Sequence, residues 1–316
     1  MKLRSRVSIQ SCVESLPVST RRASFVLTAV VVICFASGSR AGEPRDCGRF
    51  LHNGVTAHRG NSAEWPENTL AAFRSAIEVG ADWIELDVYR TRDGQLVVIH
   101  DRNTARVGDK NLVVAESTYE QLLTVDVATG FRKQHGKGVE DCQAHRIPLL
   151  EDVLRIVTAQ CRTRVSLQPK MDCVADAMAL VKRFHAEKWV GFNDGNLAYM
   201  AEVKRLAPAV PVFWDLAKTD IDADIRTALE HRFESVVLKS TIVTAECVTK
   251  LKQARIEVGV WTVNDPETMR RLLQMGVERI YTDDPRALLA LQAERKPTAS
   301  KSGAPRSHRI LRRRGR

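Results

Sequence analysis

Two histidines, an arginine and a spaced pair of acids lie within residues 58–101, each at or near the end of a β-like run. They are His58, Arg59, Glu85, Asp87 and His100. The run over residues 83–88 alternates, so Glu85 and Asp87 point to the same face of one strand. Two such carboxylates repel each other and lose hydration when buried, and a hard cation that takes oxygen ligands removes both problems. We therefore expect Glu85 and Asp87 to bind Mg²⁺ or Ca²⁺.

A solvated acidic face on an edge strand is the alternative interpretation of this acid pair. The next run, residues 96–99, is apolar without alternation and ends at His100-Asp101. Such runs are typical of parallel strands covered on both faces. We therefore expect residues 96–100 to form a parallel strand. A strand beside the acid pair argues against the interpretation of these acids as an exposed edge.

The rest of the chain alternates strand-like and helix-like segments. A helix capped by Asn68 or Thr69 is expected to end at Gly80. Repeated β-then-α units with about eight strands, no Gly-rich dinucleotide turn and no second domain predict an α/β fold, a (β/α)₈ TIM barrel. Residues 102–145 interrupt the rhythm, and we expect a small insertion there after an early strand. The remaining strands are expected near 55–57, 164–168, 189–192, 210–214, 235–238, 257–262 and 278–282, and the helices near 150–160, 174–187, 197–206, 222–232, 244–254, 266–275 and 285–293.

In such a barrel the chemistry lies at the carboxyl ends of the strands. Lys170, Trp261 and Asp283 fall at or just past predicted strand ends, as do the five residues named above. Gln168 and Lys170 share a face because side chains alternate along a strand. The barrel fold therefore predicts that polar groups from several strands converge on one rim.

Several motifs resemble those of glycerophosphodiester phosphodiesterases. They are His58-Arg59-Gly60, Pro66-Glu67-Asn68-Thr69, residues 80–88, residues 91–94, His100-Asp101, residues 147–154, residues 260–265 and residues 282–285. The likeness extends in order over roughly residues 53–292, which makes chance agreement far less plausible than for one short motif. The resemblance implies a (β/α)₈ barrel with an insertion, and hydrolysis of glycerophosphodiesters to an alcohol and glycerol 3-phosphate with one divalent cation, Ca²⁺ or Mg²⁺.

The resemblance also implies roles for individual residues. The acid–base pair would be His58 and His100, the phosphate would be held by Arg59 and Lys170, the substrate pocket would be lined by Trp261, and the metal would be bound by Glu85, Asp87 and Gln168. Gln168 departs from the family, which usually has Glu at this place. Its amide oxygen can still coordinate the cation, but one negative charge is lost, so we expect weaker metal binding.

Two other functions stay open at this point. A phospholipase D acting on lysophospholipids or sphingomyelin shares the resemblance, although the polar insertion argues against a lipid-binding lip. A phosphate-ester binding protein without activity would account for the weakened metal site at Gln168. In either case we expect a small phosphodiester as partner, and nothing in the domain indicates nucleic-acid binding.

Some of these residues also have ordinary structural explanations. Arg59 could pair with Glu67 or Asp101, and such a pair is compatible with phosphate binding. Trp261 could be barrel packing. Asp283 could serve only to cap the last helix.

The two ends of the chain differ from its middle. Residues 1–41 combine Arg21-Arg22, an apolar run over residues 23–36 and small residues before Gly42, which indicates a signal peptide and an exported, periplasmic or secreted protein. Residues 295–316 carry nine Lys or Arg and no acid, which is typical of a disordered basic tail. The ends account for net charges of +5 and +9, so the formal +10 of the chain leaves −4 for residues 42–294. Weak contact with an anionic surface is therefore expected of the tail alone.

Cysteines are consistent with export. Outside the signal the chain has Cys47, Cys142, Cys161, Cys173 and Cys247. Oxidising conditions make one or two disulfides plausible, and an odd number leaves at least one thiol without an intramolecular partner. Connectivity does not follow from the sequence.

Overall fold

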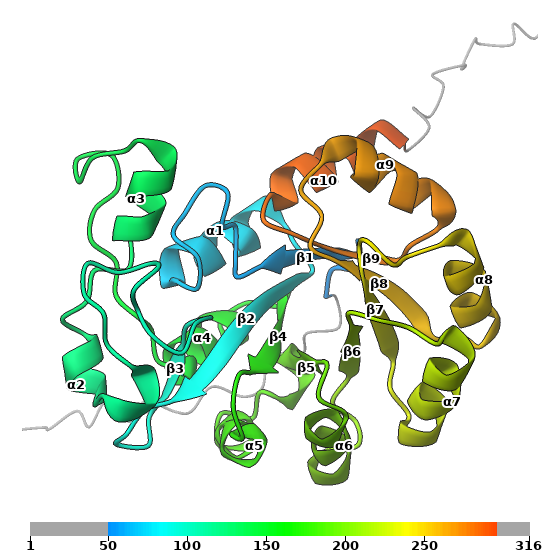
Figure 1. Cartoon of the computed structure of the whole chain (residues 1–316), viewed down its shortest axis with the longest axis horizontal. Coiled ribbons are helices and arrows are strands. Elements are labelled where there is room, and N and C mark those ends of the chain that lie inside the picture. Colours follow the sequence, from blue (N-terminus) through cyan, green and yellow to red (C-terminus); the bar gives the residue numbers. More distant parts are fainter. Residues whose placement is uncertain (1–49, 296–316) are drawn as a thin grey trace, which may run out of the picture. The chain divides into compact units, whose positions relative to one another are not determined.

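The computed structural model describes residues 50–295, which form a closed barrel of eight parallel strands with helices outside it (Figure 1). Neighbouring strands follow the order β1-β9-β8-β7-β6-β5-β4-β2, and pairing of β1 with β2 closes the ring. The predicted (β/α)₈ barrel is confirmed. The eight strands are β1 (Val55–His58), β2 (Trp83–Arg90), β4 (Arg164–Pro169), β5 (Val190–Asp194), β6 (Val212–Leu216), β7 (Ser235–Lys239), β8 (Glu257–Trp261) and β9 (Arg279–Thr282).

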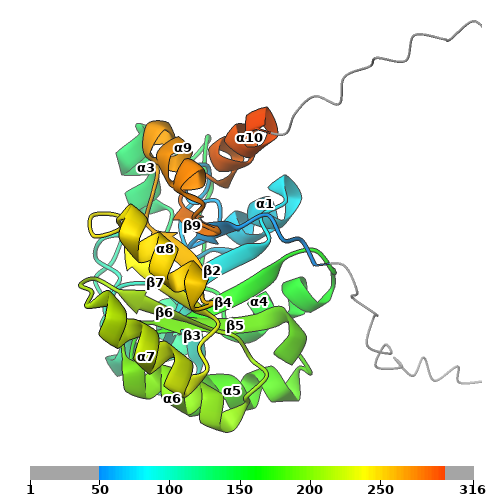
Figure 2. The same ribbon diagram turned by 90° about the vertical axis from the view of Figure 1, so that its right-hand side faces the viewer.

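The helices lie between consecutive strands and cover the outside of the barrel (Figure 2). Thr69 caps the first helix through its hydroxyl, and Gly80 ends it in the left-handed conformation at φ 92°. These are the start and stop signals that the sequence contains. The barrel helices are α1 (Leu70–Val79), α4 (Leu150–Thr158), α5 (Val174–Arg183), α6 (Leu197–Leu206), α7 (Ile221–His231), α8 (Ala245–Gln253), α9 (Pro266–Met275) and α10 (Pro285–Arg295); a short η2 (Glu187–Trp189) precedes β5.

Large side chains fill the barrel interior below its mouth. Trp83, Phe213, Val237 and Tyr281 are buried together there, and Trp261 packs against them from above. This layer closes the interior, as expected for a packed barrel rather than a pore. Polar groups on the next inward-facing positions of the same strands must therefore gather at the mouth.

The prediction for residues 96–100 was wrong in direction. β3 (Leu96–Val98) runs antiparallel to β2 and lies outside the barrel ring, with Val98 opposite Val88. Its apolar character arises because Leu96 and Val98 pack on the barrel side while Val97 and Ile99 pack on the insertion. An antiparallel strand covered on both faces gives the same sequence pattern as a parallel one.

An insertion follows β3, as expected, and it contains three short helical segments. It holds η1 (Val114–Glu116), α2 (Tyr119–Leu122) and α3 (Thr129–His135). A second, smaller core stabilises it, built on Ile99, Val107, Leu122 and Ile147 among others. The segment therefore folds as a small layer against β3, next to the barrel mouth (Figure 1).

The predicted signal peptide and residues 296–316 of the basic tail lie outside the described residues, as does Cys47. Cys161 is disulfide-bonded, whereas Cys142, Cys173 and Cys247 are free. Within residues 50–295, no helix combines the length and apolarity that a bilayer crossing requires.

Candidate active site

A cavity of about 460 Å³ opens at the carboxyl ends of the barrel strands. It brings together most of the residues that the sequence singles out, and its lining comes from seven barrel strands and the loops that follow strands. Its lining comprises His58, Arg59, Glu85, His100, Gln168, Lys170, Asn193, Gly195, Asp215, Leu216, Ala217, Trp261 and Tyr281. The structure therefore places seven of the eight predicted site residues around one cavity. The eighth, Asp87, is buried and contacts two of them, Arg59 and Lys170.

His58 is held from one side by a carboxylate. Its Nδ1 is 2.7 Å from Oδ1 of Asp283, whose Oδ2 accepts a hydrogen bond of 2.6 Å from Nδ2 of Asn264. Burial lowers the pKa of His58, but the hydrogen bond to Asp283 and the charge of Glu85 outweigh it, so the pKa is raised above 6.5. His58 therefore favours its protonated form, with Nε2 directed to the other side, 4.0 Å from Glu85.

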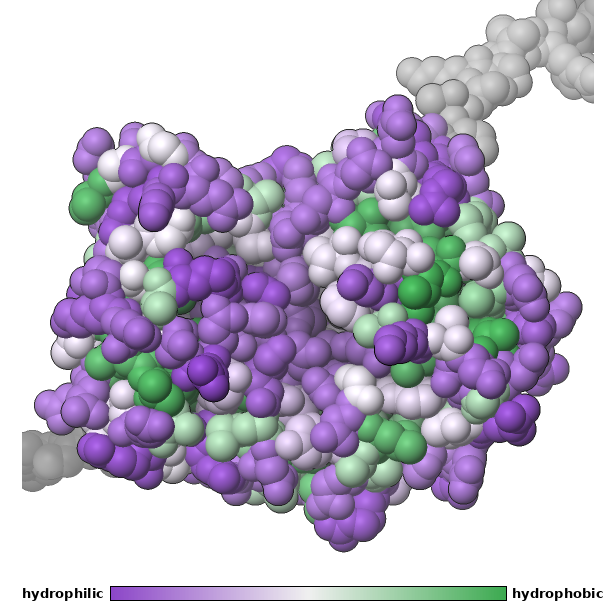
Figure 3. Space-filling model, in the orientation of Figure 1, coloured by the Kyte–Doolittle hydropathy of each residue, from purple (hydrophilic) through white to green (hydrophobic). Residues whose placement is uncertain are grey.

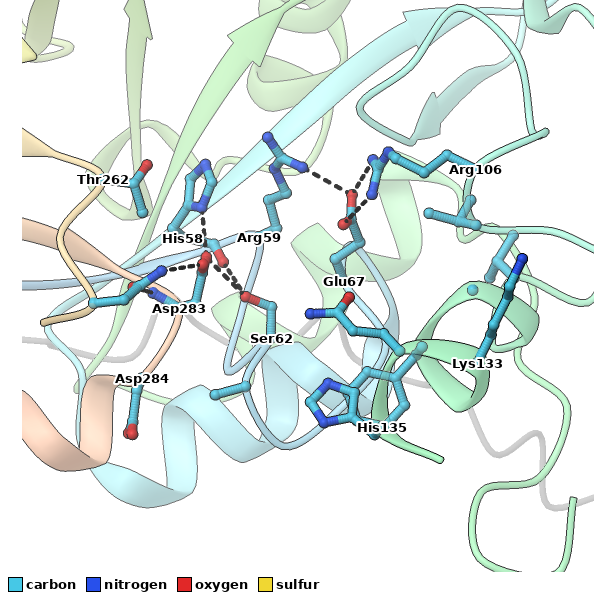
Figure 4. Close-up of a pocket in the computed structure, with 17 residues that line it drawn as sticks. His58, Arg59, Ser62, Glu67, Arg106, Lys133, His135, Thr262, Asp283 and Asp284 are labelled. Atoms are coloured by element: carbon cyan, nitrogen blue, oxygen red, sulfur yellow. Dashed lines mark hydrogen bonds and ion pairs between the residues drawn. The ribbon is translucent and has the colours of Figure 1, made fainter. Parts of the chain in front are cut away.

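The suggestion that Asp283 only caps the last helix is wrong. The neighbouring Asp284 accepts the hydrogen bond from the backbone N–H of Ala287 at the start of α10. Asp283 instead faces the barrel mouth and holds His58 (Figure 4). Ser62 also donates to it through its hydroxyl, at 3.1 Å.

His100 is also held by an acid, but its environment has the opposite effect. Its Nδ1 is 2.6 Å from Oδ1 of Asp101. Burial and the positive charges of Arg59 and Lys170 lower its pKa below 6.5, and the charge of Asp87 and the bond to Asp101 only partly oppose them. His100 therefore favours its neutral form, which can accept a proton.

Arg59 combines a strained backbone with two acidic partners. Its φ is 57°, in the left-handed region that a non-glycine residue rarely adopts. This conformation directs its backbone N–H to Oε2 of Glu85 at 3.1 Å. Its guanidinium contacts Glu67 at 3.0 Å and Asp87 at 3.6 Å. The predicted pairing with Glu67 is present, while Asp101 pairs with another arginine, Arg106.

The acid pair lies inside the barrel, so the alternative of a solvated acidic face is wrong. Glu85 is 2% exposed and Asp87 is fully buried. Burial and the charge of Asp87 raise the pKa of Glu85 to about 7. Oδ2 of Asp87 accepts from Asn68, whereas its buried Oδ1 has no hydrogen bond and lies 3.5 Å from Nζ of Lys170. No lysine or arginine side chain among the described residues pairs with Glu85, and one oxygen of Asp87 has no hydrogen bond, which suits a bound cation.

Gln168 lies next to Asp87 in the β2–β4 register. Its Oε1 accepts from Lys170 at 3.2 Å, and its Nε2 donates to Asp215 at 3.4 Å. No group of three or more His, Cys, Asp or Glu side chains within residues 50–295 is arranged to hold a metal ion. Glu85, Asp87 and Gln168 nevertheless offer carboxylate and amide oxygens from the neighbouring strands β2 and β4, and these are the donor types that a hard cation prefers.

The position of Trp261 is compatible with both explanations considered for it, barrel packing and a place in the pocket wall. It packs on the layer of large side chains inside the barrel, and it forms part of the cavity wall. Its indole N–H is buried without a hydrogen-bond partner in the described residues. A ligand oxygen in the cavity could accept this hydrogen bond.

A wider cleft of about 930 Å³ adjoins the cavity and shares His58 and Arg59 with it. It lies between the barrel rim and α3 of the insertion. The centre of the face in Figure 3 is hollowed and mostly hydrophilic. Lys133 and His135 line it from α3, opposite Asp283 (Figure 4). The insertion therefore forms one wall of the approach to the two histidines.

Sequence reasoning missed two functional candidates, Arg106 and Asp215, and named Asp283 and Glu67 only as a strand-end residue and a possible partner of Arg59. Arg106 and Glu67 join the networks behind Arg59 and His100, Asp283 holds His58, and Asp215 lines the inner cavity. Asp215 follows an apolar strand, Phe213-Trp214, at an inward position, which is a usable signal. Arg106 has no such signal because it lies in an irregular loop, and only folding brings it to the site.

Comparisons with known proteins agree with this geometry. A model of the glycerophosphoryl diester phosphodiesterase family matches residues 58–287. A glycerophosphodiester phosphodiesterase of Caldanaerobacter subterraneus subsp. tengcongensis is 31% identical over 244 residues, 75% of this chain and 96% of that protein. A provisionally named glycerophosphoryl diester phosphodiesterase of Silicibacter pomeroyi has a crystal structure with TM-score 0.69 and 25% identity, covering 78% of this chain and 95% of that one. A phosphodiesterase of Oleispira antarctica, solved with the product sn-glycerol-3-phosphate, has TM-score 0.67 and 21% identity, covering 76% and 96%.

Proposed function

The chain belongs to the glycerophosphoryl diester phosphodiesterase family, and on this premise we propose that it hydrolyses glycerophosphodiesters by a two-histidine mechanism with a divalent cation. One observation carries the mechanism. His58 and His100, each held at Nδ1 by a carboxylate, line the same cavity as Arg59 and Lys170. A phosphodiester placed between them meets two cations and two imidazoles.

The opposite environments of the two histidines assign their roles. His100, with its lowered pKa, accepts the proton of the nucleophile, which is water or the glycerol 2-hydroxyl of the substrate. His58, with its raised pKa, donates a proton to the departing alkoxide as the phosphorus–oxygen bond breaks. With the 2-hydroxyl as nucleophile, a cyclic phosphate forms first and water opens it. Both routes end in an alcohol and glycerol 3-phosphate.

Charge stabilisation falls to the cationic side chains. Arg59 and Lys170 lie on either side of Asp87 and orient the non-bridging phosphate oxygens. Glu85, Asp87 and Gln168 are the residues that would hold the cation. When bound, the cation supplies Lewis-acid polarisation of the phosphate. Gln168 keeps an oxygen donor but adds no negative charge, so binding is weaker than at a site with three carboxylates.

The wider cleft supports a polar leaving group. Ser62, Gln134, Thr262 and Asn264 contribute polar groups, and the charged residues add to them. The glycerol phosphate half would occupy the inner cavity, where Arg59 and Lys170 lie. The Oleispira antarctica neighbour was solved with sn-glycerol-3-phosphate as its product. Ala63, Val107, Val127 and Phe131 also line this cleft, so an acyl chain would meet apolar as well as polar groups there. The substrate panel below separates the phospholipase D alternative.

The test is a substrate panel with purified full-length protein. We expect release of glycerol 3-phosphate from glycerophosphocholine with saturating Ca²⁺ or Mg²⁺, loss of release with chelator, and much slower cleavage of lysophosphatidylcholine. No cleavage of any diester under saturating metal would leave only the binding-protein alternative. Faster cleavage of the lysophospholipid would favour the phospholipase D alternative.

The histidines are tested separately from the substrate class. His58→Ala and His100→Ala should each lower kcat by about 10²- to 10⁴-fold, because a positioned proton donor or acceptor contributes that much. Their melting temperatures should stay near that of the wild type. A variant that keeps its activity removes that histidine from the mechanism.

We further propose that the protein is exported and that its basic tail weakly contacts anionic surfaces. The apolar run after Arg21-Arg22 and the nine basic residues from Arg295 onward support this. Cell fractionation, and vesicle binding with and without residues 296–316, would test it. A protein retained at full length in the cytoplasm would contradict export.

A further inference from the structure

Arg106, from the insertion, contacts two acids. Glu67 bonds the proposed phosphate-binding residue Arg59, and Asp101 bonds the proposed base His100. Arg106 donates from Nη1 and Nη2 to the two oxygens of Glu67, each at 2.7 Å. Its Nε donates to Oδ2 of Asp101 at 2.6 Å. All three nitrogens are therefore used, and a single planar group fixes the separation of the two carboxylates.

Each of the two carboxylates also forms a hydrogen bond with a different active-site residue. Oε1 of Glu67 accepts from Nη1 of Arg59 at 3.0 Å. Oδ1 of Asp101 lies 2.6 Å from Nδ1 of His100. The connected series runs Arg59–Glu67–Arg106–Asp101–His100, and Figure 4 shows its part from Arg59 to Arg106. A shift of Arg106 would move both ends.

The backbone at Arg106 is fixed by α3. The N–H of Gly130 donates to the carbonyl of Val107 at 2.9 Å, and Val107 is buried in the core of the insertion. A Cβ at Gly130 would lie 2.4 Å from the carbonyl oxygen of Arg106, so only glycine allows this approach. The position of Arg106 therefore depends on the folded insertion.

We propose that Arg106 is a positioning residue that sets Arg59 and His100 together, so that the insertion takes part in assembling the active site. This inference rests on the roles proposed above for Arg59 and His100. Arg106 itself need not touch the substrate. Burial raises the pKa of both Glu67 and Asp101, but the bonds from Arg106 help to outweigh it, and both pKa values are lowered. Both acids thus stay ionised and keep their acceptor oxygens for Arg59 and His100.

The side chain of Arg106 is 47% exposed, so its value lies in geometry more than in stability. Exposed ion pairs contribute little to the free energy of unfolding. The guanidinium fork, however, meets two acids at fixed angles, which a lysine ammonium cannot do. Arg106 variants should therefore fold normally and lose catalytic geometry.

The experiment compares Arg106→Ala and Arg106→Lys with a matched control, Arg286→Ala. Arg286 also forms two hydrogen bonds with one acid, Glu64, and it lines neither the inner cavity nor the wider cleft. For Arg106→Ala we expect kcat to fall by about 10- to 100-fold, since small displacements of reacting groups cost that much. We also expect the Kd for glycerol 3-phosphate, from calorimetry, to rise roughly tenfold through the loosened Arg59. The control should change both by less than about twofold.

Three further variants separate positioning from a structural role. Glu67→Gln should mainly raise the Kd, and Asp101→Asn should mainly lower kcat, because each loosens one end of the series. Arg106→Lys should restore at most one of the two parameters, since an ammonium holds one acid at a time. Melting temperatures of all variants should stay near that of Arg286→Ala.

The outcomes decide the inference without ambiguity. If the wild type is active and Arg106→Ala has the same kcat and Kd as the wild type, the inference is overturned and the proposed function stays intact. Full recovery of both parameters by lysine would also overturn it, because charge alone would then suffice. If the wild type has no turnover, the proposed function fails, and an unchanged Kd in Arg106→Ala would overturn the inference as well. Should Arg106→Ala not fold, Glu67→Gln and Asp101→Asn carry the test.

Discussion

At the scale of single residues, the two histidines differ through their neighbours rather than through their own chemistry. His58 faces Asp283 on one side and Glu85 on the other, so negative charge surrounds it. His100 has Asp101, but the cations Arg59 and Lys170 are also close. When the pKa values of two groups are separated in this way, one group can be protonated and act as the acid while the other is neutral and acts as the base at the same pH.

The pH dependence of activity should reflect this difference. Activity should fall at low pH as His100 becomes protonated, below its ordinary pKa of 6.5, and at high pH as His58 loses its proton, above 6.5. Asp283→Asn replaces the charged acceptor that raises the pKa of His58 with a neutral amide. We expect its high-pH limb to move to lower pH while the low-pH limb stays in place. The measurement is kcat/KM against pH with glycerophosphocholine and saturating cation.

Movement of the low-pH limb in this variant, or of neither limb, would contradict the assignment of His58 as the acid. Asp101→Asn provides the mirror comparison, because it should affect His100 and the low-pH limb.

At the scale of elements, the antiparallel return of β3 decides where His100 lies. β2 extends past the barrel rim to Arg90, and β3 pairs back along it until the N–H of Ile99 reaches the carbonyl of Asp87 at 3.0 Å. His100 therefore comes next to the acid pair. A parallel strand would need a long crossover connection after β2, so residue 100 could not follow β2 within ten residues and still lie at the same rim. The hairpin also begins the insertion that supplies Arg106.

Helix α3 contributes through one close contact, which gives a prediction. Gly130→Ala places a methyl group where the carbonyl oxygen of Arg106 lies 2.4 Å away. We expect a loss of about 1–3 kcal/mol in the free energy of unfolding, as for other overpacked sites. Displacement of Arg106 should also lower kcat. Chemical denaturation and steady-state kinetics would measure the two effects.

Gln134→Ala, on the same helix but exposed, is the control for helix stability, and its free energy of unfolding should stay within about 0.5 kcal/mol of the wild type. If Gly130→Ala is as stable as the wild type, the loop can move to accept the methyl group at no cost. The close approach of Gly130 would then not fix the position of Arg106.

At the scale of the whole molecule, the barrel mouth holds three acids, of which only Asp87 contacts a lysine or arginine side chain among the described residues. Glu85, Asp87 and Asp215 all lie at the mouth, and the pKa of Asp215 is raised well above its ordinary value by burial. Arg59 and Lys170 contact Asp87, and among the described residues no lysine or arginine side chain pairs with the other two. Burial of such groups destabilises the fold unless a cation binds. We therefore expect saturating Ca²⁺ or Mg²⁺ to raise the melting temperature.

Gln168→Glu tests this linkage. Without metal it should melt below the wild type, because Gln168 donates to Asp215 at 3.4 Å and a glutamate would repel that acid. With metal its gain in melting temperature should exceed that of the wild type, since a third carboxylate strengthens cation binding. Titration calorimetry gives the affinities directly. A cation affinity equal to or below that of the wild type would remove residue 168 from the metal site.

Much of this molecule follows from local sequence. The alternation over residues 83–88, the caps at Thr69 and Gly80, and the regular strand–helix spacing specify elements of a barrel. Once the fold is a barrel, strand ends must share one rim, so His58, Glu85 and Lys170 could be placed together without coordinates. These inferences work because period and capping depend on near neighbours in the chain.

Only the tertiary structure decided the direction of β3, the partner of Asp283 and the position of Arg106. Burial on two faces gives one apolar pattern whether a strand is parallel or antiparallel, so the sequence of residues 96–99 could not distinguish them. Asp283 and His58 are 225 residues apart, and Arg106 reaches Glu67 from a loop 39 residues away. Such contacts depend on loop paths that packing of the whole insertion sets, and no local period encodes them.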